Sequence, residues 1–392
     1  MQANIGYNRV FARIDMDNLR FNLFQMKKRV KPDMKVLAVI KADAYGHGAV
    51  EIAKRIGDIA DYYGVATIDE AIELRNAGID TPILIIGYTD SSDYKKLIKY
   101  DITQTVYDVE ECKKMSDLAV SMGQKVKVHI KVDTGMSRIG FEVSEEGVSK
   151  ALILKDLEGL DIEGIFTHYA KADETDKTFS MLQKDRFKWF IQQMNEAGVS
   201  FKLRHIDNSA GTMDLDDDEF DMVRLGIVTY GLYPSDEVDK SILLKPVMSL
   251  ISHVIHVKML DEGVGVGYGG TFVTSRRTKV ATVAVGYADG YPRAQSNVGK
   301  VIINGQYANV IGRVCMDQLM IDVTDIDDVK VKDEVILVGK CGDKCIGVEE
   351  VAAPAASFNY EFVCNIGRRV PRVYHENNQD TICVKYLLAN HN

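Results

Sequence analysis

Short apolar segments alternate with amphipathic segments along the first two-thirds of the chain, and this alternation limits the possible folds more than any other feature. The apolar segments have the length of strands, and the amphipathic segments have the length of single helices. Such a pattern predicts parallel strands joined by crossover helices. The expected strands are 36–40, 63–66, 83–86, 104–106, 126–132, 162–167, 203–206 and 222–225. The clearest expected helices are 48–56, 68–77, 109–122 and 178–197.

About eight such units over roughly 220 residues favour a closed barrel over an open sheet, because closed parallel barrels usually span that length. After Pro234 the residue pattern changes to segments rich in Val and Ile, which are separated by glycine and aspartate turns. In this part of the chain only 348–356 has the pattern of a helix. The expected β segments there are 248–260, 279–286, 300–314, 319–323 and 334–339. We therefore expect an α/β chain, with a (β/α)8 barrel over 1–235 and a mostly β domain over 236–392. The first few residues are expected to pair with the second domain.

Composition excludes several classes of partner. The chain has 48 Lys plus Arg against 57 Asp plus Glu, a net charge of -9, and no basic run, so nucleic acid is not expected to bind. Its apolar runs are far too short to span a bilayer. The N-terminal residues lack the features of an export signal, so we expect a cytoplasmic protein.

The six cysteines lie at 112, 315, 341, 345, 364 and 383. They are too sparse for a disulfide scaffold and lack the paired spacing of a zinc site, so we expect reduced thiols and no metal.

The segment 39–48 reads Val-Ile-Lys-Ala-Asp-Ala-Tyr-Gly-His-Gly and delivers Lys41 to the end of an expected strand. In a parallel barrel the carboxyl ends of the strands form the catalytic face. A lone lysine at such a place is also typical of an exposed side chain. The surrounding decamer, however, resembles the cofactor-lysine motif of the alanine racemase family.

This resemblance continues in order through nearly the whole sequence. The further segments similar to the family are 131–140, 167–170, 208–210, 224–227, 266–271, 286–290 and 312–318. It implies a barrel followed by a β-rich domain, pyridoxal phosphate as cofactor, and interconversion of L- and D-alanine. It also implies a small amino acid as substrate and, in a bacterium, supply of D-alanine for peptidoglycan.

By this resemblance Lys41 carries the cofactor and moves a proton on one face of the substrate, while Tyr268 does so on the other face. A primary amine suits the first task because it condenses with an aldehyde and, when buried, has a lowered pKa. Tyr268 lies in a glycine-rich segment, where a purely structural turn tyrosine is the alternative.

Arg224 matches the family arginine that faces the pyridine nitrogen. Because arginine does not give up its proton, that nitrogen stays largely unprotonated, which favours return of the proton to the α-carbon over side reactions. His205 matches the histidine that supports this arginine, and a satisfied core histidine is the alternative.

The resemblance assigns the cofactor phosphate to Tyr45, Ser209 and the backbone amides of Gly226 and Ile227. Many relatives add a tyrosine just before an Arg-Val-Pro stretch, but Arg368 stands at that position here, and this departure leaves the contact open.

Arg138 is expected to contact the cofactor's phenolic oxygen and the substrate carboxylate, since a guanidinium can bridge two acceptors. Lys131 matches a lysine that is carbamylated in many relatives, with an ordinary paired lysine as the alternative. His168 resembles the histidine that stacks near the pyridine ring.

Met316 and Asp317 resemble residues on the substrate side of the second domain. Tyr287 would help to close the entrance, and a core aromatic is its alternative. Because Lys41 and Tyr268 belong to different domains, the resemblance implies a homodimer in which each tyrosine completes the partner's site.

Three alternative functions remain from the residues alone. A serine or broad-specificity racemase shares most of these motifs. A decarboxylase of related architecture is disfavoured by Arg224, because decarboxylation benefits from a protonated pyridine. A non-catalytic carrier of the cofactor leaves the β-rich domain without a role.

Overall fold

The computed structural model describes residues 9–388, which form two compact units. Among the described residues, the barrel unit comprises 20–44 and 49–245, and the β unit comprises 9–19, 45–48 and 246–388. This division differs from the two continuous ranges expected from the sequence, because an N-terminal strand and the segment 45–48 join the β unit. The ranges 1–235 and 236–392 stay a prediction, and residues 1–8, expected to pair with the second domain, lie outside the described residues.

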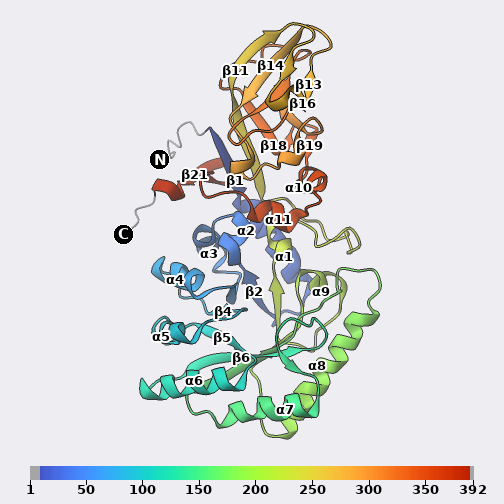
Figure 1. Ribbon diagram of the computed structural model, residues 1–392. Helices are drawn as coiled ribbons and strands as arrows, with labels where there is room; N and C mark the ends of the chain where they lie inside the picture. The colour runs from blue at the N-terminus through green and yellow to red at the C-terminus, as the bar shows by residue number, and fades with distance from the viewer. Residues whose placement is uncertain (1–8, 389–392) are drawn as a thin grey trace. The chain divides into compact units, whose positions relative to one another are not determined.

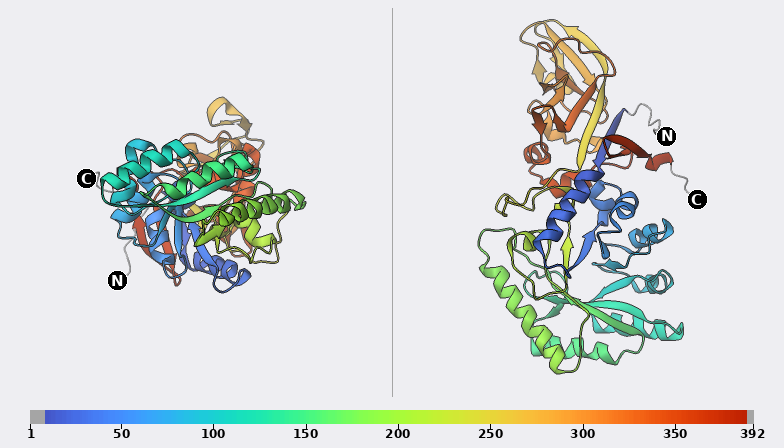
Figure 2. Two further views of the ribbon diagram at one scale, coloured as in Figure 1. Left: turned by 90° about the horizontal axis from the view of Figure 1, so that it is seen from below. Right: turned by 180° about the vertical axis from the view of Figure 1, so that it is seen from behind.

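The barrel unit is built on eight parallel strands (Figures 1 and 2). They are β2 (Lys35–Val39), β3 (Tyr62–Val65), β4 (Ile83–Ile85), β5 (Thr103–Val106), β6 (Val126–Asp133), β8 (Leu160–Phe166), β9 (Leu203–His205) and β10 (Met222–Leu225). The strands pair in the order β10-β2-β3-β4-β5-β6-β8-β9, and the short β7 (Phe141–Glu142) pairs with β6. Backbone hydrogen bonds from Asp221 N to Arg204 O (2.9 Å) and from Arg224 N to Asp207 O (3.1 Å) bring the two ends together. The sheet is a nearly closed barrel, which confirms the predicted fold.

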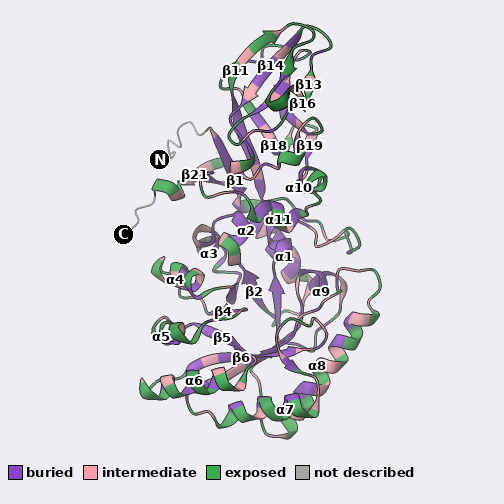
Figure 3. Cartoon of the chain, in the orientation of Figure 1, coloured by how far each residue is buried: buried purple, intermediate pink, exposed green. Residues whose placement is uncertain are grey.

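Helices follow most of these strands, as in a repeating βα unit (Figure 1). They are α1 (Met16–Arg29), α2 (Lys41–Gly46), α3 (Ala49–Ile56), α4 (Ile68–Asn76), α5 (Tyr94–Lys99), α6 (Val109–Ser121), α7 (Glu145–Leu152), α8 (Thr178–Glu196) and α9 (Ser209–Asp214). Several begin at a side chain that accepts a backbone N–H of the first turn, as Thr67, Asp108 and Ser144 do. Figure 3 shows buried strands and helices whose outer faces are exposed.

A ten-stranded sheet forms the β unit, in the order β19-β18-β15-β16-β17-β14-β11-β1-β20-β21. Two of its strands, β1 (Val10–Asp15) and β11 (Met248–Leu260), pair antiparallel. The others are β14 (Thr278–Val283), β15 (Lys300–Ile303), β16 (Gln306–Ile311), β17 (Leu319–Asp322), β18 (Glu334–Cys341), β19 (Lys344–Ile346), β20 (Arg372–Glu376) and β21 (Gln379–Val384). A separate hairpin joins β12 (Gly265–Val266) to β13 (Phe272–Val273), and two helices complete the unit, α10 (Val348–Ala352) and α11 (Asn359–Cys364).

Two expectations for the β unit are wrong. The segment 300–314 is a hairpin instead of one β segment, because Asn304 and Gly305 both take positive φ angles (47° and 71°) and turn the chain between β15 and β16. The helical content also exceeds the single segment 348–356, since α11 follows it. With only six residues, α11 is too short to show a helical repeat in the sequence.

Candidate active site

Lys41 lies directly beyond β2, at the carboxyl end of a barrel strand. It begins an unusual turn, because Ala42, Asp43, Ala44 and Tyr45 all have φ angles between 52° and 54°. This is one turn of left-handed helix, which costs roughly 1–2 kcal/mol per residue for side chains other than glycine. The rest of the structure must therefore hold the backbone after Lys41 in place.

Glu70, at the start of α4, provides much of that support. Its Oε1 accepts the Ala42 N–H at 2.7 Å, and its Oε2 accepts the N–H of Ala66 at 2.7 Å and of Thr67 at 3.3 Å. Ala44 N donates to Ile40 O at 2.9 Å. One carboxylate thus joins the left-handed turn to the loop after β3.

Arg224, on β10, is buried and surrounded by hydrogen-bond acceptors. Its Nη1 donates to His205 Nδ1 at 2.9 Å, and its Nη2 lies within hydrogen-bond distance of Thr167 O (2.8 Å), Ile206 O (2.8 Å) and His168 Nδ1 (3.1 Å). Burial lowers the pKa of Arg224 to about 10, so the guanidinium remains charged at neutral pH. Arg224 donates every one of these hydrogen bonds, and the four acceptors hold its side chain in one orientation.

His168 lies close to the predicted cations of the barrel unit. Desolvation lowers its pKa well below the usual value, and Arg224, Lys131, Arg138 and Lys41 lower it further, in that order. His168 is therefore neutral. Arg224 is in direct contact with this imidazole, since its Nη2 lies 3.1 Å from His168 Nδ1.

Lys131 is buried on β6, where its Nζ donates to Val132 O at 2.7 Å. Burial lowers the pKa of Lys131 to about 7, and the charge of Arg224 acts in the same direction. The ring of Phe166 lies 5.4 Å from its Nζ and 5.3 Å from the Arg224 Cζ. Near neutral pH a substantial fraction of the Lys131 amine is therefore uncharged. Arg138, in the loop after β6, is exposed.

The expected phosphate residues of the barrel unit adjoin one another. Ser209 begins α9 after β9, and its Oγ accepts the Gly226 N–H at 3.0 Å. Ile227 begins a 3-10 turn after β10. A hydroxyl and backbone amides from two neighbouring strand ends are the donors that an anionic phosphate requires.

Tyr45, by contrast, belongs to the β unit. Burial raises the pKa of its hydroxyl, and Tyr360 and Cys364 raise it further. The segment that follows is fixed there, since Arg372 Nε donates to Gly46 O at 2.8 Å and Tyr374 donates to His47 O at 3.1 Å. Glycine is required at 46, because a Cβ would lie 2.1 Å from Val363 O.

The remaining predicted residues lie in loops of the β unit. Tyr268 is in the turn between β12 and β13, with its side chain 71% exposed. Tyr287 N donates to Cys315 O, and Ala288 N donates to Met316 O, both at 3.1 Å. The structure therefore brings Tyr287 together with Met316, while Tyr268 lies in a hairpin of its own.

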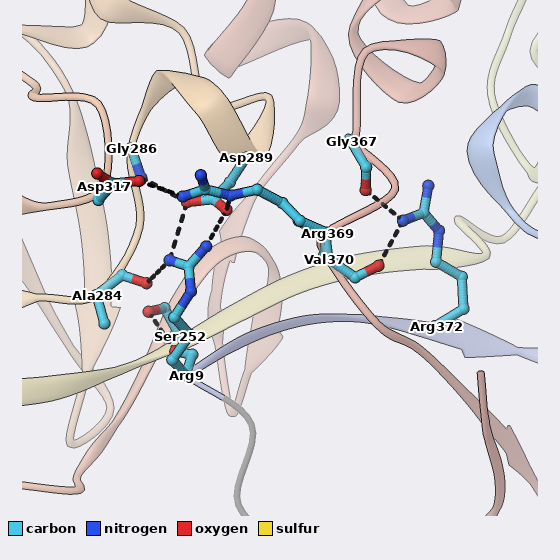
Figure 4. Close-up of polar contacts among 10 residues, drawn as sticks. All are labelled: Arg9, Ser252, Ala284, Gly286, Asp289, Asp317, Gly367, Arg369, Val370 and Arg372. Atoms are coloured by element: carbon cyan, nitrogen blue, oxygen red, sulfur yellow. Dashed lines mark hydrogen bonds and ion pairs between the residues drawn. The ribbon is translucent and has the colours of Figure 1, made fainter. Parts of the chain in front are cut away.

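A buried carboxylate that the sequence reasoning missed organises this region (Figure 4). Asp289 is fully buried and forms an ion pair with Arg9. Its carboxylate also accepts hydrogen bonds from Gly286 N at 3.0 Å and from Arg369 Nε at 2.7 Å. Arg369 also binds Asp317. Asp289 and Arg369 both lie in segments similar to those of the family, but neither side chain carries an obvious chemical role by itself.

Arg368, at the position where many relatives have tyrosine, is exposed, and its Cζ lies 5.4 Å from the centre of the Tyr386 ring.

Comparison with known proteins identifies the family. Residues 14–234 match the model of the alanine racemase N-terminal domain, and residues 247–374 match that of the C-terminal domain. The chain belongs to the alanine racemase family. An alanine racemase of Clostridium perfringens is 47% identical over 380 residues, which cover 96% of this chain and 98% of that protein.

Solved structures of the family agree with this assignment. An alanine racemase of Clostridium difficile 630 superposes with a TM-score of 0.94 at 45% identity, over 98% of this chain and 100% of that one. A complex of that enzyme with cycloserine gives a TM-score of 0.92 at 44% identity, with the same coverage. This chain is accordingly a member of a family of isomerases.

Residues 9–388 contain neither a membrane-spanning helix nor a cluster of metal ligands. No helix there is both long and apolar enough to cross a membrane. Within the same residues, no group of three or more His, Cys, Asp and Glu side chains is placed to hold a metal ion.

Replacing Glu70 tests the support of the left-handed turn. We expect Glu70→Ala to lower the free energy of unfolding by about 1–3 kcal/mol, because it leaves the Ala42 N–H without its acceptor. Denaturant unfolding measures the loss. The matched control is Asp69→Ala, which removes an exposed carboxylate from the same turn of α4. Equal losses for the two variants would contradict the assigned role.

Proposed function

We propose that this protein interconverts L- and D-alanine with pyridoxal phosphate carried on Lys41. The observation that carries the proposal is buried Arg224 in contact with His168 and His205, in the same barrel as Lys41 at the end of β2 and the strand ends that offer phosphate donors. Membership of the alanine racemase family supports the same reaction.

The residues of the barrel unit fit that cofactor. We assign its phosphate to Ser209, Gly226 and Ile227, with Tyr45 from the β unit. Arg224 would face the pyridine nitrogen, because a group that only donates hydrogen bonds keeps that nitrogen unprotonated. When bound, pyridoxal phosphate withdraws the electrons that remain at the α-carbon once its proton is removed.

Two side chains would move that proton. We assign the Nζ of Lys41 to one face of the substrate and the hydroxyl of Tyr268 to the other, because inversion requires removal on one side and delivery on the opposite side. His205 would hold Arg224 in place, and His168 would lie beside the ring.

Binding of the substrate carboxylate is assigned to Arg138 and Met316. Lys131 would steady Arg138, and its lowered pKa favours the carbamylated form, since only an uncharged amine reacts with carbon dioxide. Asp317 and Tyr287 would line the substrate side. Asp289 supports this arrangement, because Arg369 links it to Asp317.

A homodimer with shared sites accounts for the exposure of Tyr268. In the single chain its side chain is 71% exposed, and Val264 and Val273, which flank the same hairpin, are exposed as well. An exposed apolar patch around a predicted catalytic residue is typical of a protein interface. We place the reaction in the cytoplasm, where it would supply D-alanine for peptidoglycan.

The first test is racemisation of alanine by the purified protein loaded with pyridoxal phosphate. We expect Lys41→Ala to abolish it, whereas Lys35→Ala, at the other end of β2, retains it. After borohydride treatment, peptide mapping should find the cofactor on Lys41 in the unmodified protein. Cofactor fixed on Lys131 instead, an amine whose pKa burial lowers, would contradict the assignment.

A substrate panel separates alanine from serine. We expect the higher kcat/KM for alanine, because Tyr45 and Tyr287 would leave room for little more than a methyl group. Discrimination by such a pocket is about 1–3 kcal/mol, so slow turnover of serine is compatible with the proposal. A higher kcat/KM for serine, or release of carbon dioxide, would overturn it.

Complementation tests the shared site. Lys41→Ala and Tyr268→Phe should each be inactive alone, whereas an equal mixture should recover about a quarter of the normal activity. This fraction follows because half of the randomly exchanged dimers are mixed, and each mixed dimer contains one intact site of two. Co-purification of differently tagged chains verifies the exchange. Verified exchange without recovered activity would show that each site is built within one chain.

A further inference from the structure

Four polar side chains form a continuous line through the inside of the barrel unit. Arg224 on β10 lies 2.9 Å from His205 Nδ1, and His205 Nε2 lies 2.9 Å from His129 Nδ1. The line ends at Glu163, whose Oε2 is 3.3 Å from His129 Nε2. Its members come from β10, β9, β6 and β8, so the line connects strands that are distant in sequence.

The chemistry of the two ends fixes the direction of every hydrogen bond. A guanidinium only donates, so His205 must accept through Nδ1 and carry its hydrogen on Nε2. That hydrogen is donated to His129 Nδ1, which in turn leaves the His129 hydrogen on Nε2. This last hydrogen points at Glu163, and a carboxylate only accepts. All three bonds are satisfied by this one arrangement of neutral imidazoles.

The packing around the line leaves the rings little freedom. Both imidazoles are fully buried, and Phe166 stacks on His205 with ring centres 4.7 Å apart and planes at 1°. Residue 164 is glycine, and a Cβ there would lie 2.7 Å from the His129 ring. Burial also lowers the pKa of both histidines, so each carries a single ring hydrogen.

Loss of Glu163 would leave Arg224 alone to oppose the opposite arrangement. In that arrangement His129 holds its hydrogen on Nδ1, so His205 accepts on Nε2 and carries its own hydrogen on Nδ1. That hydrogen would face the N–H of Arg224, and the guanidinium would lose an acceptor. The carboxylate therefore acts together with Arg224 to favour one of the two ring forms of His205.

We propose that Glu163 and His129 are positioning residues, which fix the hydrogen of His205 on Nε2 and thereby hold Arg224 in the orientation that its role at the cofactor ring requires. The inference rests on the proposed function for the role of Arg224. The positions of the ring hydrogens on His129 and His205 can be measured whether or not the protein racemises alanine.

The decisive measurement is nitrogen-15 NMR of the histidine rings in the full-length protein, with and without pyridoxal phosphate. Single His129→Asn and His205→Asn variants assign the signals. We expect both rings to be neutral with the hydrogen on Nε2. A hydrogen on Nδ1 of either ring, or a doubly protonated ring, in the unmodified protein would overturn the proposal.

Variants at Glu163 then test whether this carboxylate controls the positions of the ring hydrogens. Glu163→Ala should move a measurable fraction of the hydrogen from Nε2 to Nδ1 in the two rings, because Arg224 alone then opposes the shift, whereas Glu163→Gln should keep the normal pattern, because its amide oxygen can still accept from His129. Asp161→Asn, which removes a carboxylate two residues away on β8, should change nothing. An unaltered ring pattern in folded Glu163→Ala would contradict the proposal.

Kinetics connects the line to catalysis. We expect Glu163→Ala to lower kcat for alanine about tenfold, with Glu163→Gln recovering most of that loss. If Glu163→Gln is as impaired as Glu163→Ala while its rings keep the normal pattern, the ring form does not control the reaction. Absence of racemisation by the unmodified protein would instead refute the proposed function, and the ring measurements would still stand.

Discussion

A charged guanidinium lies inside the barrel unit, and the partners of its Nη atoms are neutral acceptors: two backbone carbonyls and two imidazoles. The carboxyl group of Asp207 acts on Arg224 through its charge and raises its pKa against the effect of burial. Burial lowers the pKa values of Lys131, His168 and His205, and the charge of Arg224 lowers them further. A buried cation with neutral hydrogen-bond partners thus helps to keep a lysine and two histidines available as neutral groups at neutral pH.

Backbone strain has a similar role at Lys41. The four residues after it adopt a left-handed conformation that none of their side chains favours. Glu70 holds the first of these residues, and the segment 45–48 belongs to the β unit, where Arg372 and Tyr374 bind its carbonyls. The chain therefore passes between the two units within a few residues of the lysine. Strain is maintained at this position by contacts on both sides of the turn.

The sequence predicts the barrel well, because strand and helix repeats follow directly from burial on one or both faces. The expected range of β10 coincides with the observed one, and the other seven strands differ by one or two residues at one end or both. It does not predict the left-handed turn, since Ala-Asp-Ala-Tyr contains no glycine to indicate positive φ. Glu70, Glu163 and Asp289 were also missed. Each is a carboxylate whose role appears only when the fold places it beside a partner distant in sequence.

A carboxylate beside an arginine both orients the guanidinium and balances its charge. Glu163 lies two imidazoles away from Arg224, so these two effects are separated. A carboxylate in direct contact with Arg224 would orient the guanidinium, but it would also balance its charge and return Lys131 and His168 toward their ordinary pKa values. Two intervening imidazoles transmit the orientation through the hydrogens they carry, while the added distance weakens the Coulomb interaction. Arg224 can then be held firmly while its direct hydrogen-bond partners stay neutral.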